Sequence, residues 1–118
     1  MNGLGSVRKF EYRPCRIETG FNVDFVTDAE TLYGCCKDVS DAGIRATLDR
    51  PAEVGCSGLL ILRHPTGVLE IQAQVAYVDH CQVGLVFTFR TPWEHELTNE
   101  YIASIVNPLA ASLVVRFP

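Results

Sequence analysis

Three runs of the sequence alternate between apolar and polar side chains, and this alternation constrains the fold more than any other feature. The longest run covers residues 69–78, and shorter runs cover residues 44–48 and 83–89. Successive side chains of a β-strand point to opposite faces, so a period of two gathers the apolar side chains of each run on one side. Each run therefore predicts a strand that faces a core on one side and solvent on the other.

Further extended segments complete this pattern. Residues 17–26 predict a first strand, residues 32–48 a second extended segment, and the apolar residues 59–62 a buried strand. Turn or chain-breaking signals follow at residues 49–51, 64–67 and 79–82. Five or six short strands joined by tight turns predict a small antiparallel β-barrel, because closure of a sheet removes its exposed edges.

The periodicity changes to that of a helix at Thr91. Thr91 suits the N-cap, Pro92 the first helical position, and Glu94 the last position of a capping box. Apolar side chains then recur every four residues, at Trp93, Leu97, Tyr101 and Ile105. This spacing predicts a helix with one apolar face on the barrel. The aromatic residues expected in the core are Phe21, Phe25, Phe87, Phe89 and Trp93.

The length and charge of the chain limit its class. Its 118 residues suffice for one domain, which we divide into an arginine-bearing arm or loop (1–16), a barrel (17–90) and a helix with a tail (91–118). The net charge of −4 argues against a general nucleic-acid binder, which normally presents a basic surface. No apolar run approaches the roughly 18 residues of a membrane span, and the first residues do not form a signal peptide.

The five cysteines are an odd number and include no C-x-x-C pair. This pattern indicates reduced thiols in a cytoplasm, and its spacing does not suit zinc. No paired carboxylates, phosphate-cradling glycine loop or metal ligands stand out. We therefore expect no catalytic residue, no metal and no cofactor.

A polar corner precedes the alternating run at residues 44–48. Asp38 and Ser40 flank one apolar residue, and Gly43 follows three residues after Ser40. Short Asp and Ser side chains favour a tight turn by bonding nearby backbone amides, and glycine permits positive φ or close approach. The segment predicts a turn that holds a carboxylate and a hydroxyl at fixed positions and leads into a core strand.

Arginines, then a strand, then Asp-x-Ser-x-x-Gly is the order of motifs in PilZ domains, the bacterial receptors for cyclic di-GMP. The chain resembles that family over residues 8–105. In the family, an Arg-x-x-x-Arg loop folds over the ligand while the Asp-x-Ser-x-x-Gly corner meets guanine on the barrel surface. The resemblance implies a mostly β fold, a six-stranded split β-barrel with a C-terminal α-helix. It matches Arg16 to the second arginine and Asp38, Ser40 and Gly43 to the corner.

The chain departs from the family at the first arginine of the motif, where Tyr12 stands. Arg13 and Arg8 are the candidates to replace it. Tyrosine stacks on a base but supplies no charge, so the loss of one charged partner weakens binding by about 1–3 kcal/mol. The ligand-binding residues that the resemblance implies are Arg8, Arg13, Arg16, Asp38, Ser40 and Gly43.

These residue types match the chemistry of cyclic di-GMP, which has two phosphates and two guanine bases. The arginine fork binds phosphate oxygens or the O6/N7 edge of guanine bidentately, and its flat face stacks on a base. The N1–H and N2–H₂ groups of guanine are donors and need an acceptor. Asp38 is acceptor-only when it is ionised.

These features together predict a cytoplasmic cyclic di-GMP receptor that is not an enzyme. Ligand binding would order residues 8–16 and change the surface offered to a protein effector. The resemblance implies an effector in motility, pili, secretion, biofilm or exopolysaccharide synthesis. No DNA or RNA partner and no membrane span are expected. One alternative is a PilZ-like interaction module that has lost the ligand through Tyr12, and another is a small thiol enzyme that uses Cys81 or Cys36.

Overall fold

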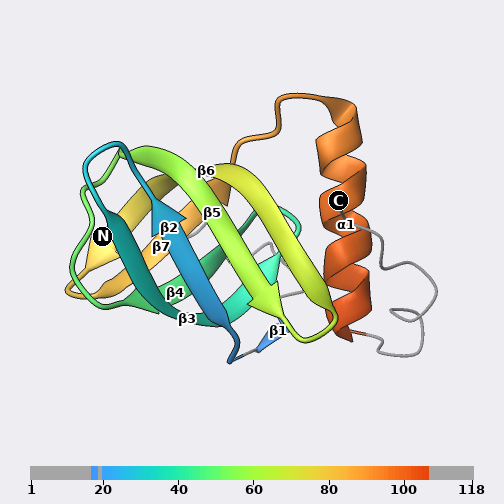
Figure 1. Ribbon diagram of the computed structural model, residues 1–118, viewed down its shortest axis with the longest axis horizontal. Helices are drawn as coiled ribbons and strands as arrows, with labels where there is room; N and C mark the ends of the chain where they lie inside the picture. Colours follow the sequence, from blue (N-terminus) through green and yellow to red (C-terminus); the bar gives the residue numbers. More distant parts are fainter. Residues whose placement is uncertain (1–16, 19, 107–118) are drawn as a thin grey trace, which may run out of the picture.

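The described chain forms an antiparallel β-barrel with one helix beside it (Figure 1). The computed structural model describes residues 17–18 and 20–106. The elements are β1 (Ile17–Glu18), β2 (Asn22–Val26), β3 (Thr31–Ser40), β4 (Gly43–Leu48), β5 (Ser57–His64), β6 (Gly67–Asp79), β7 (Gln82–Phe87) and α1 (Pro92–Val106). The prediction of a mostly β fold followed by a helix is confirmed. Within these residues, no helix is long and apolar enough to span a membrane.

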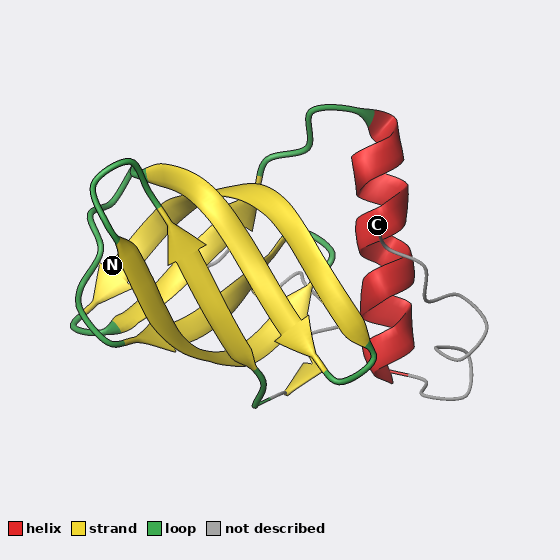
Figure 2. Cartoon of the chain, viewed as in Figure 1, coloured by secondary structure: helices red, strands yellow, loops and turns green. Residues whose placement is uncertain are grey.

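Six of the strands close the barrel. They pair antiparallel in the order β3–β2–β5–β6–β7–β4, and β4 returns to pair with β3. Figure 2 shows this closed sheet in yellow. The seventh strand, β1, pairs with Val39 and Asp38 of β3, beyond Cys35, where the pairing of β2 with β3 begins. The predicted six-stranded barrel is confirmed, although the predicted first strand, residues 17–26, divides into β1 and β2.

The alternating runs supply the core of the barrel, as the sequence predicts. Their buried side chains are Ile44, Ala46 and Leu48 on β4, Leu69, Ile71, Ala73 and Val75 on β6, and Val83, Leu85 and Phe87 on β7. Full burial of a Val, Leu, Ile or Phe side chain stabilises a fold by about 1.5–3 kcal/mol. Phe21 and Phe25 are also in the core, whereas Phe89 lies beyond the end of β7 and is only partly buried.

The start of α1 follows the sequence prediction in part. Thr91 Oγ1 accepts a hydrogen bond from the backbone N–H of Glu94 at 3.1 Å, as an N-cap does. The carboxylate of Glu94, however, accepts from the N–H of Arg90 at 2.9 Å, one residue before the predicted partner. The prediction that Trp93 packs in the core is wrong, because 63% of this residue is exposed. The fully buried side chains of α1 begin one turn later, at Thr98.

Tyr101 joins α1 to the hairpin between β5 and β6. Its hydroxyl lies within hydrogen-bonding distance of the carbonyls of Leu62 (3.2 Å) and Gly67 (3.1 Å), and it accepts from the N–H of His64 at 3.2 Å. Burial raises the pKa of Tyr101 to about 12. Figure 1 shows the last turns of α1 beside the tip of this hairpin.

His64 is partly buried at the end of β5. Its ring meets that of Phe21 edge-on, with the ring centroids 5.1 Å apart. Its Nδ1 accepts a hydrogen bond from the backbone N–H of Thr66 at 3.1 Å. Partial burial lowers the pKa of His64. His80, by contrast, has a side chain that is 95% exposed.

Candidate functional site

The arginine part of the predicted site lies outside the described residues. These positions are Arg8, Tyr12, Arg13 and Arg16. The first described strand, β1, begins at the residue after Arg16 and pairs with Val39 and Asp38. The described chain thus begins beside Asp38, which belongs to the Asp-x-Ser-x-x-Gly part of the predicted site.

A β-bulge at Lys37 turns Asp38 and Ser40 to the outer face of the barrel. Cys36 points into the core, so uninterrupted alternation would direct residues 38 and 40 inward as well. The register with β4 shifts between Cys36 and Asp38, which leaves Lys37 as the extra residue. Asp38 therefore pairs with the outward-facing Arg45, and Ser40 shares its face.

The turn lies later in the chain than the sequence predicts. Asp38 and Ser40 are the last part of β3, and the chain reverses at Asp41 and Ala42. Ser40 Oγ accepts a hydrogen bond from the N–H of Ala42 at 3.3 Å and donates to the carbonyl of Gly43 at 3.4 Å. Ser40 therefore stabilises the β3–β4 hairpin as well as presenting a hydroxyl near Asp38.

Gly43 is needed because β7 passes too close for a side chain. A Cβ at this position would lie 2.1 Å from the carbonyl oxygen of Leu85. The described glycines with positive φ are Gly55 and Gly67, so close approach, and not φ, explains Gly43. This glycine therefore has a structural role whether or not a ligand also contacts it.

Arg45, a residue outside the predicted site, holds Asp38 in place. Arg45 Nε donates to Asp38 Oδ2 at 2.6 Å, and Nη2 contacts the same oxygen. The side chain of Asp38 is 4% exposed and that of Arg45 is 49% exposed. The hydrogen bond to Asp38 is the main reason that the pKa of Arg45 is raised. Partial burial opposes this rise, whereas the negative charge of Asp38 and the interaction with Tyr77 increase it. The alternation of side chains from Gly43 onward is the sequence signal that Arg45 faces outward.

A row of residues continues from this ion pair across the sheet. Arg45 pairs with Gly84 on β7, and Gly84 pairs with Tyr77 on β6. A Cβ at Gly84 would lie 2.1 Å from Cε2 of Tyr77, so the tyrosine ring lies directly over the glycine. The missing side chain at Gly84 therefore lets the Tyr77 ring extend across β7 toward Arg45.

A shallow groove of about 680 Å³ lies on the same outer face. Residues of β2, β3, β4 and β5 line it, and they include Tyr33 and the ion pair of Asp24 with Arg63 at 2.9 Å. Cys35 and Thr47 also line it, and this pair is the outward pair next to Asp38 and Arg45 in the β3–β4 ladder. The groove thus adjoins the ion pair of Asp38 with Arg45.

Of the two thiols proposed for an enzyme, Cys36 lies in the core and Cys81 lies in the turn after β6. Cys36 is fully buried, and its Sγ lies 3.4 Å from the carbonyl of Asp38. His80, next to Cys81 in the turn after β6, directs Nδ1 to Asp79 Oδ1 at 2.8 Å. Among residues 17–18 and 20–106, no group of three His, Cys, Asp or Glu side chains is placed to hold a metal ion.

Comparison with known proteins finds similarity in structure only. No protein-family model matches the chain, and no curated protein matches its sequence. The PilZ domain of CeSA from a cellulose-synthesizing bacterium superposes with a TM-score of 0.66 at 13% identity, over 79% of this chain and 99% of that domain. The PilZ domain of YcgR from Escherichia coli, solved with c-di-GMP, gives a TM-score of 0.68 at 15% identity, over 86% and 96%.

A third match, the MrkH–c-di-GMP complex of K. pneumonia, has a TM-score of 0.66 at 16% identity. It covers 80% of this chain and 52% of MrkH, so this chain spans about half the length of that protein. These identities are too low to carry residue roles, but the coverage includes most of the barrel and helix described above. This chain therefore has the fold of a PilZ domain.

Proposed function

We propose that this chain is a cyclic di-GMP receptor that binds the ligand on the outer face of its barrel. Asp38 accepts hydrogen bonds from one guanine, with Ser40 beside it, and the arginines within residues 8–16 bind the phosphates. The observation that carries this proposal is the bulge at Lys37, which places a carboxylate and a hydroxyl on the outer face. Bulges often re-aim side chains next to functional sites.

Two further observations support the proposal. The solved structures of YcgR and MrkH that share this fold contain c-di-GMP. The strand β1 begins directly after Arg16 and pairs with Asp38, a position that favours an arginine loop next to this carboxylate. Arginine, carboxylate and hydroxyl together provide the donors and acceptors that phosphates and guanine need.

The proposed role is recognition without catalysis. Binding orders residues 8–16 against the barrel and so changes the surface that a protein effector meets, which is a common mode of switching. The effector belongs to motility, pilus or polysaccharide machinery in the cytoplasm. No cofactor takes part.

Calorimetric titration of the purified protein with cyclic di-GMP tests this proposal, with GTP and cyclic di-AMP as control ligands. We expect selective binding with a Kd of about 1 μM or lower, equivalent to about 8 kcal/mol. An absence of heat, together with an unchanged melting temperature at high ligand concentration, would reject the receptor and leave the fold assignment standing.

A protein-interaction module that does not bind cyclic di-GMP is the second candidate. Tyr12, in place of the first arginine of the motif, favours it. The exposure of Trp93 on α1 also favours it, because exposed aromatic residues are enriched at protein interfaces. The same titration separates the two candidates, since the module gives no heat with any cyclic dinucleotide.

A further inference from the structure

We propose that the groove over β2, β3, β4 and β5 binds the second guanine of cyclic di-GMP, which stacks on Tyr33 while Asp24 and Arg63 read its Watson–Crick edge. This inference rests on the proposed function, because it takes the first guanine to bind at Asp38. It assigns base contacts to three residues outside the Asp-x-Ser-x-x-Gly pattern. The inference follows from the pairing of the strands, the atoms that one ion pair leaves open and the chemistry of the base.

The register of β2 with its two neighbours brings the three side chains together. Tyr33 on β3 pairs directly with Asp24 on β2, so their side chains stand side by side on one face. Arg63 on β5 pairs with Asn22, two residues before Asp24, and its guanidinium reaches Asp24 diagonally. All four residues line the groove of about 680 Å³. The groove therefore holds an aromatic ring, a carboxylate and a guanidinium next to one another.

The ion pair of Asp24 with Arg63 uses one oxygen of the carboxylate and one edge of the guanidinium. Arg63 Nε and Nη2 donate to Asp24 Oδ2 at 3.3 and 2.9 Å. Among residues 17–18 and 20–106, neither Asp24 Oδ1 nor Arg63 Nη1 makes a hydrogen bond or an ion pair. The side chain of Asp24 is 17% exposed and that of Arg63 is 48% exposed. An acceptor and a donor are thus open to the groove side by side.

A donor beside an acceptor complements the Watson–Crick edge of guanine. That edge presents in order the acceptor O6, the donor N1–H and the donor N2–H₂. Arg63 donates to O6 while Asp24 accepts from N1–H and N2–H₂. Adenine presents a donor, N6–H₂, where guanine has O6, and an acceptor, N1, where guanine has N1–H, so both contacts become repulsive. The pair therefore selects guanine over adenine.

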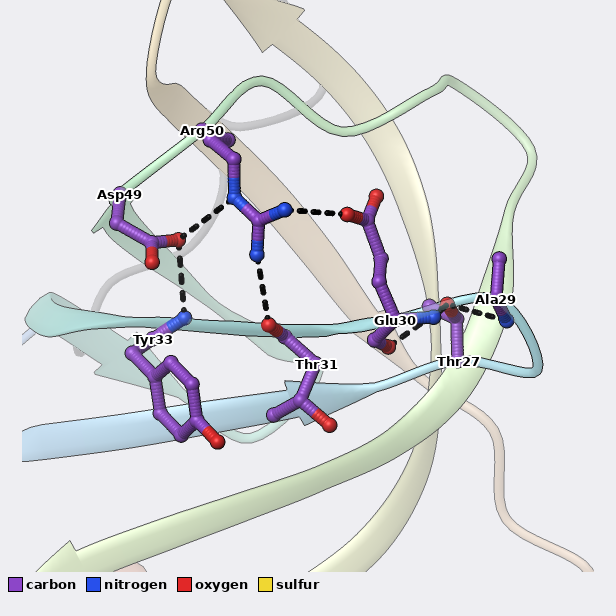
Figure 3. A network of polar contacts seen from close by, with 7 residues as sticks. All are labelled: Thr27, Ala29, Glu30, Thr31, Tyr33, Asp49 and Arg50. Carbon is purple, nitrogen blue, oxygen red and sulfur yellow. Dashed lines mark hydrogen bonds and ion pairs between the residues drawn. The ribbon is translucent and has the colours of Figure 1, made fainter.

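Tyr33 supplies the flat surface on which the base stacks, and the residue is 55% exposed. Its N–H donates to Asp49 Oδ1 at 3.1 Å, and its carbonyl accepts from the N–H of Asp49 at 2.7 Å. Figure 3 shows that Asp49 belongs to a network with Arg50, and that the Tyr33 ring points away from this network. The backbone of Tyr33 is therefore fixed while its ring is free to contact a ligand. Stacking of a base on an aromatic side chain contributes about fivefold to hundredfold in affinity.

The groove adjoins the place where the first guanine binds. Cys35 and Thr47, the outward pair next to Asp38 and Arg45 in the β3–β4 ladder, line the groove. A cyclic dinucleotide carries its two bases on opposite sides of one ring. A ligand held at Asp38 by one guanine can therefore place the other in the groove, and we expect one molecule of ligand per chain.

A simpler role for Arg63 is to stabilise the barrel surface, without touching a base. Cyclic GMP–AMP separates the two roles, because it has one guanine, which binds at Asp38, and one adenine, which the groove repels. If Arg63 reads guanine, its removal weakens cyclic di-GMP and leaves cyclic GMP–AMP nearly unchanged. If Arg63 acts only on the structure, its removal weakens both ligands by the same factor.

The matched control is Arg90, because its ion pair has the same form. Arg90 Nε and Nη2 donate to Glu94 Oε2 at 2.9 and 2.6 Å, and the side chain of Arg90 is 69% exposed. Arg90 lies two residues before α1 begins and is not among the residues that line the groove. Arg90→Met therefore removes a surface ion pair of the same geometry without touching the proposed subsite.

The experiment titrates the wild type, Arg63→Met, Tyr33→Leu and Arg90→Met with cyclic di-GMP and cyclic GMP–AMP by calorimetry. The wild type should prefer cyclic di-GMP. Arg63→Met and Tyr33→Leu should each weaken cyclic di-GMP by about tenfold. Arg63→Met should leave the Kd of cyclic GMP–AMP within about twofold of the wild type, so the preference narrows. Arg90→Met should leave both Kd values within about twofold.

Thermal melting verifies that each variant is folded, and Arg63→Lys replaces Arg63→Met if the latter is not. Lysine keeps a charge beside Asp24 but has no second edge for O6, so the same narrowing of the preference is expected. Equal losses with both ligands would overturn the inference, as would equal effects of the Arg63 and Arg90 variants or two ligands per chain. A wild type that binds neither ligand would reject the proposed function and, with it, this inference.

Discussion

At the scale of single residues, the extra residue Lys37 determines which face of β3 carries Asp38 and Ser40. Without this extra residue, alternation along the strand would point Asp38 and Ser40 into an apolar core, where an unpaired carboxylate is strongly destabilising. With it, Asp38 meets Arg45 on the outer face and stays almost fully buried there. One residue thus converts the end of a core strand into a polar site.

His64 gives the protein a dependence of stability on pH. Because burial lowers its pKa in the folded state, the unfolded chain takes up a proton first as the pH falls. The contribution of His64 to the free energy of unfolding is therefore constant at pH values above its unfolded pKa of about 6.5. As the pH is lowered from there to the folded pKa, this contribution decreases. We expect the urea concentration at the midpoint of unfolding to decrease when the pH is lowered from 7.5 to 5.5.

The comparison of His64→Gln with His80→Gln shows whether His64 causes this dependence of stability on pH. The fall on acidification should be smaller in His64→Gln than in the wild type, whereas His80→Gln should behave as the wild type because His80 is exposed. An identical fall in both variants would show that other groups cause it.

At the scale of elements, the attachment of α1 depends on its buried polar and apolar contacts to the β5–β6 hairpin. Tyr101 contributes most, because its ring is fully buried and its hydroxyl contacts three backbone groups. Ser104 adds a contact of 3.2 Å to Thr66 in the same hairpin. The helix is thus fixed to the barrel near its C-terminal end.

Tyr101→Phe keeps the ring and removes the hydroxyl. We expect it to lower the free energy of unfolding by about 1–3 kcal/mol, because it leaves buried backbone groups without this partner. Trp93→Phe, an aromatic change at the exposed start of the same helix, should change it by about 0.5 kcal/mol or less. Urea unfolding measures both, and equal effects would contradict the proposed attachment of α1.

The elements show which features of this fold can be predicted from the sequence. Alternation in residues 69–78 and 44–48 predicted β6 and β4, and the Thr91 cap predicted where α1 begins, because these signals are local. The bulge at Lys37 has no local signal, since it depends on how β3 and β4 pair. The contact of Arg45 with Asp38 was missed for the same reason. Trp93 was misplaced because helical spacing does not show where along a helix the barrel contact begins.

At the scale of the whole molecule, a closed barrel presents a rigid outer face on which small changes have local effects. Asp38, Arg45, Gly84 and Tyr77 lie in register across four strands that are tied by continuous pairing. The groove beside them extends the same face. A site built on strands in this way holds its groups closely.

Titration of Asp38→Asn with cyclic di-GMP tests most directly whether this outer face is the binding site. The amide presents a donor where guanine also has donors, so we expect affinity to fall by at least about tenfold. Asp79→Asn, an exposed change in the β6–β7 turn, should bind as the wild type does. Unchanged affinity in a folded Asp38→Asn protein would contradict the account, because the bulge at Lys37 would then present a carboxylate that the ligand does not use.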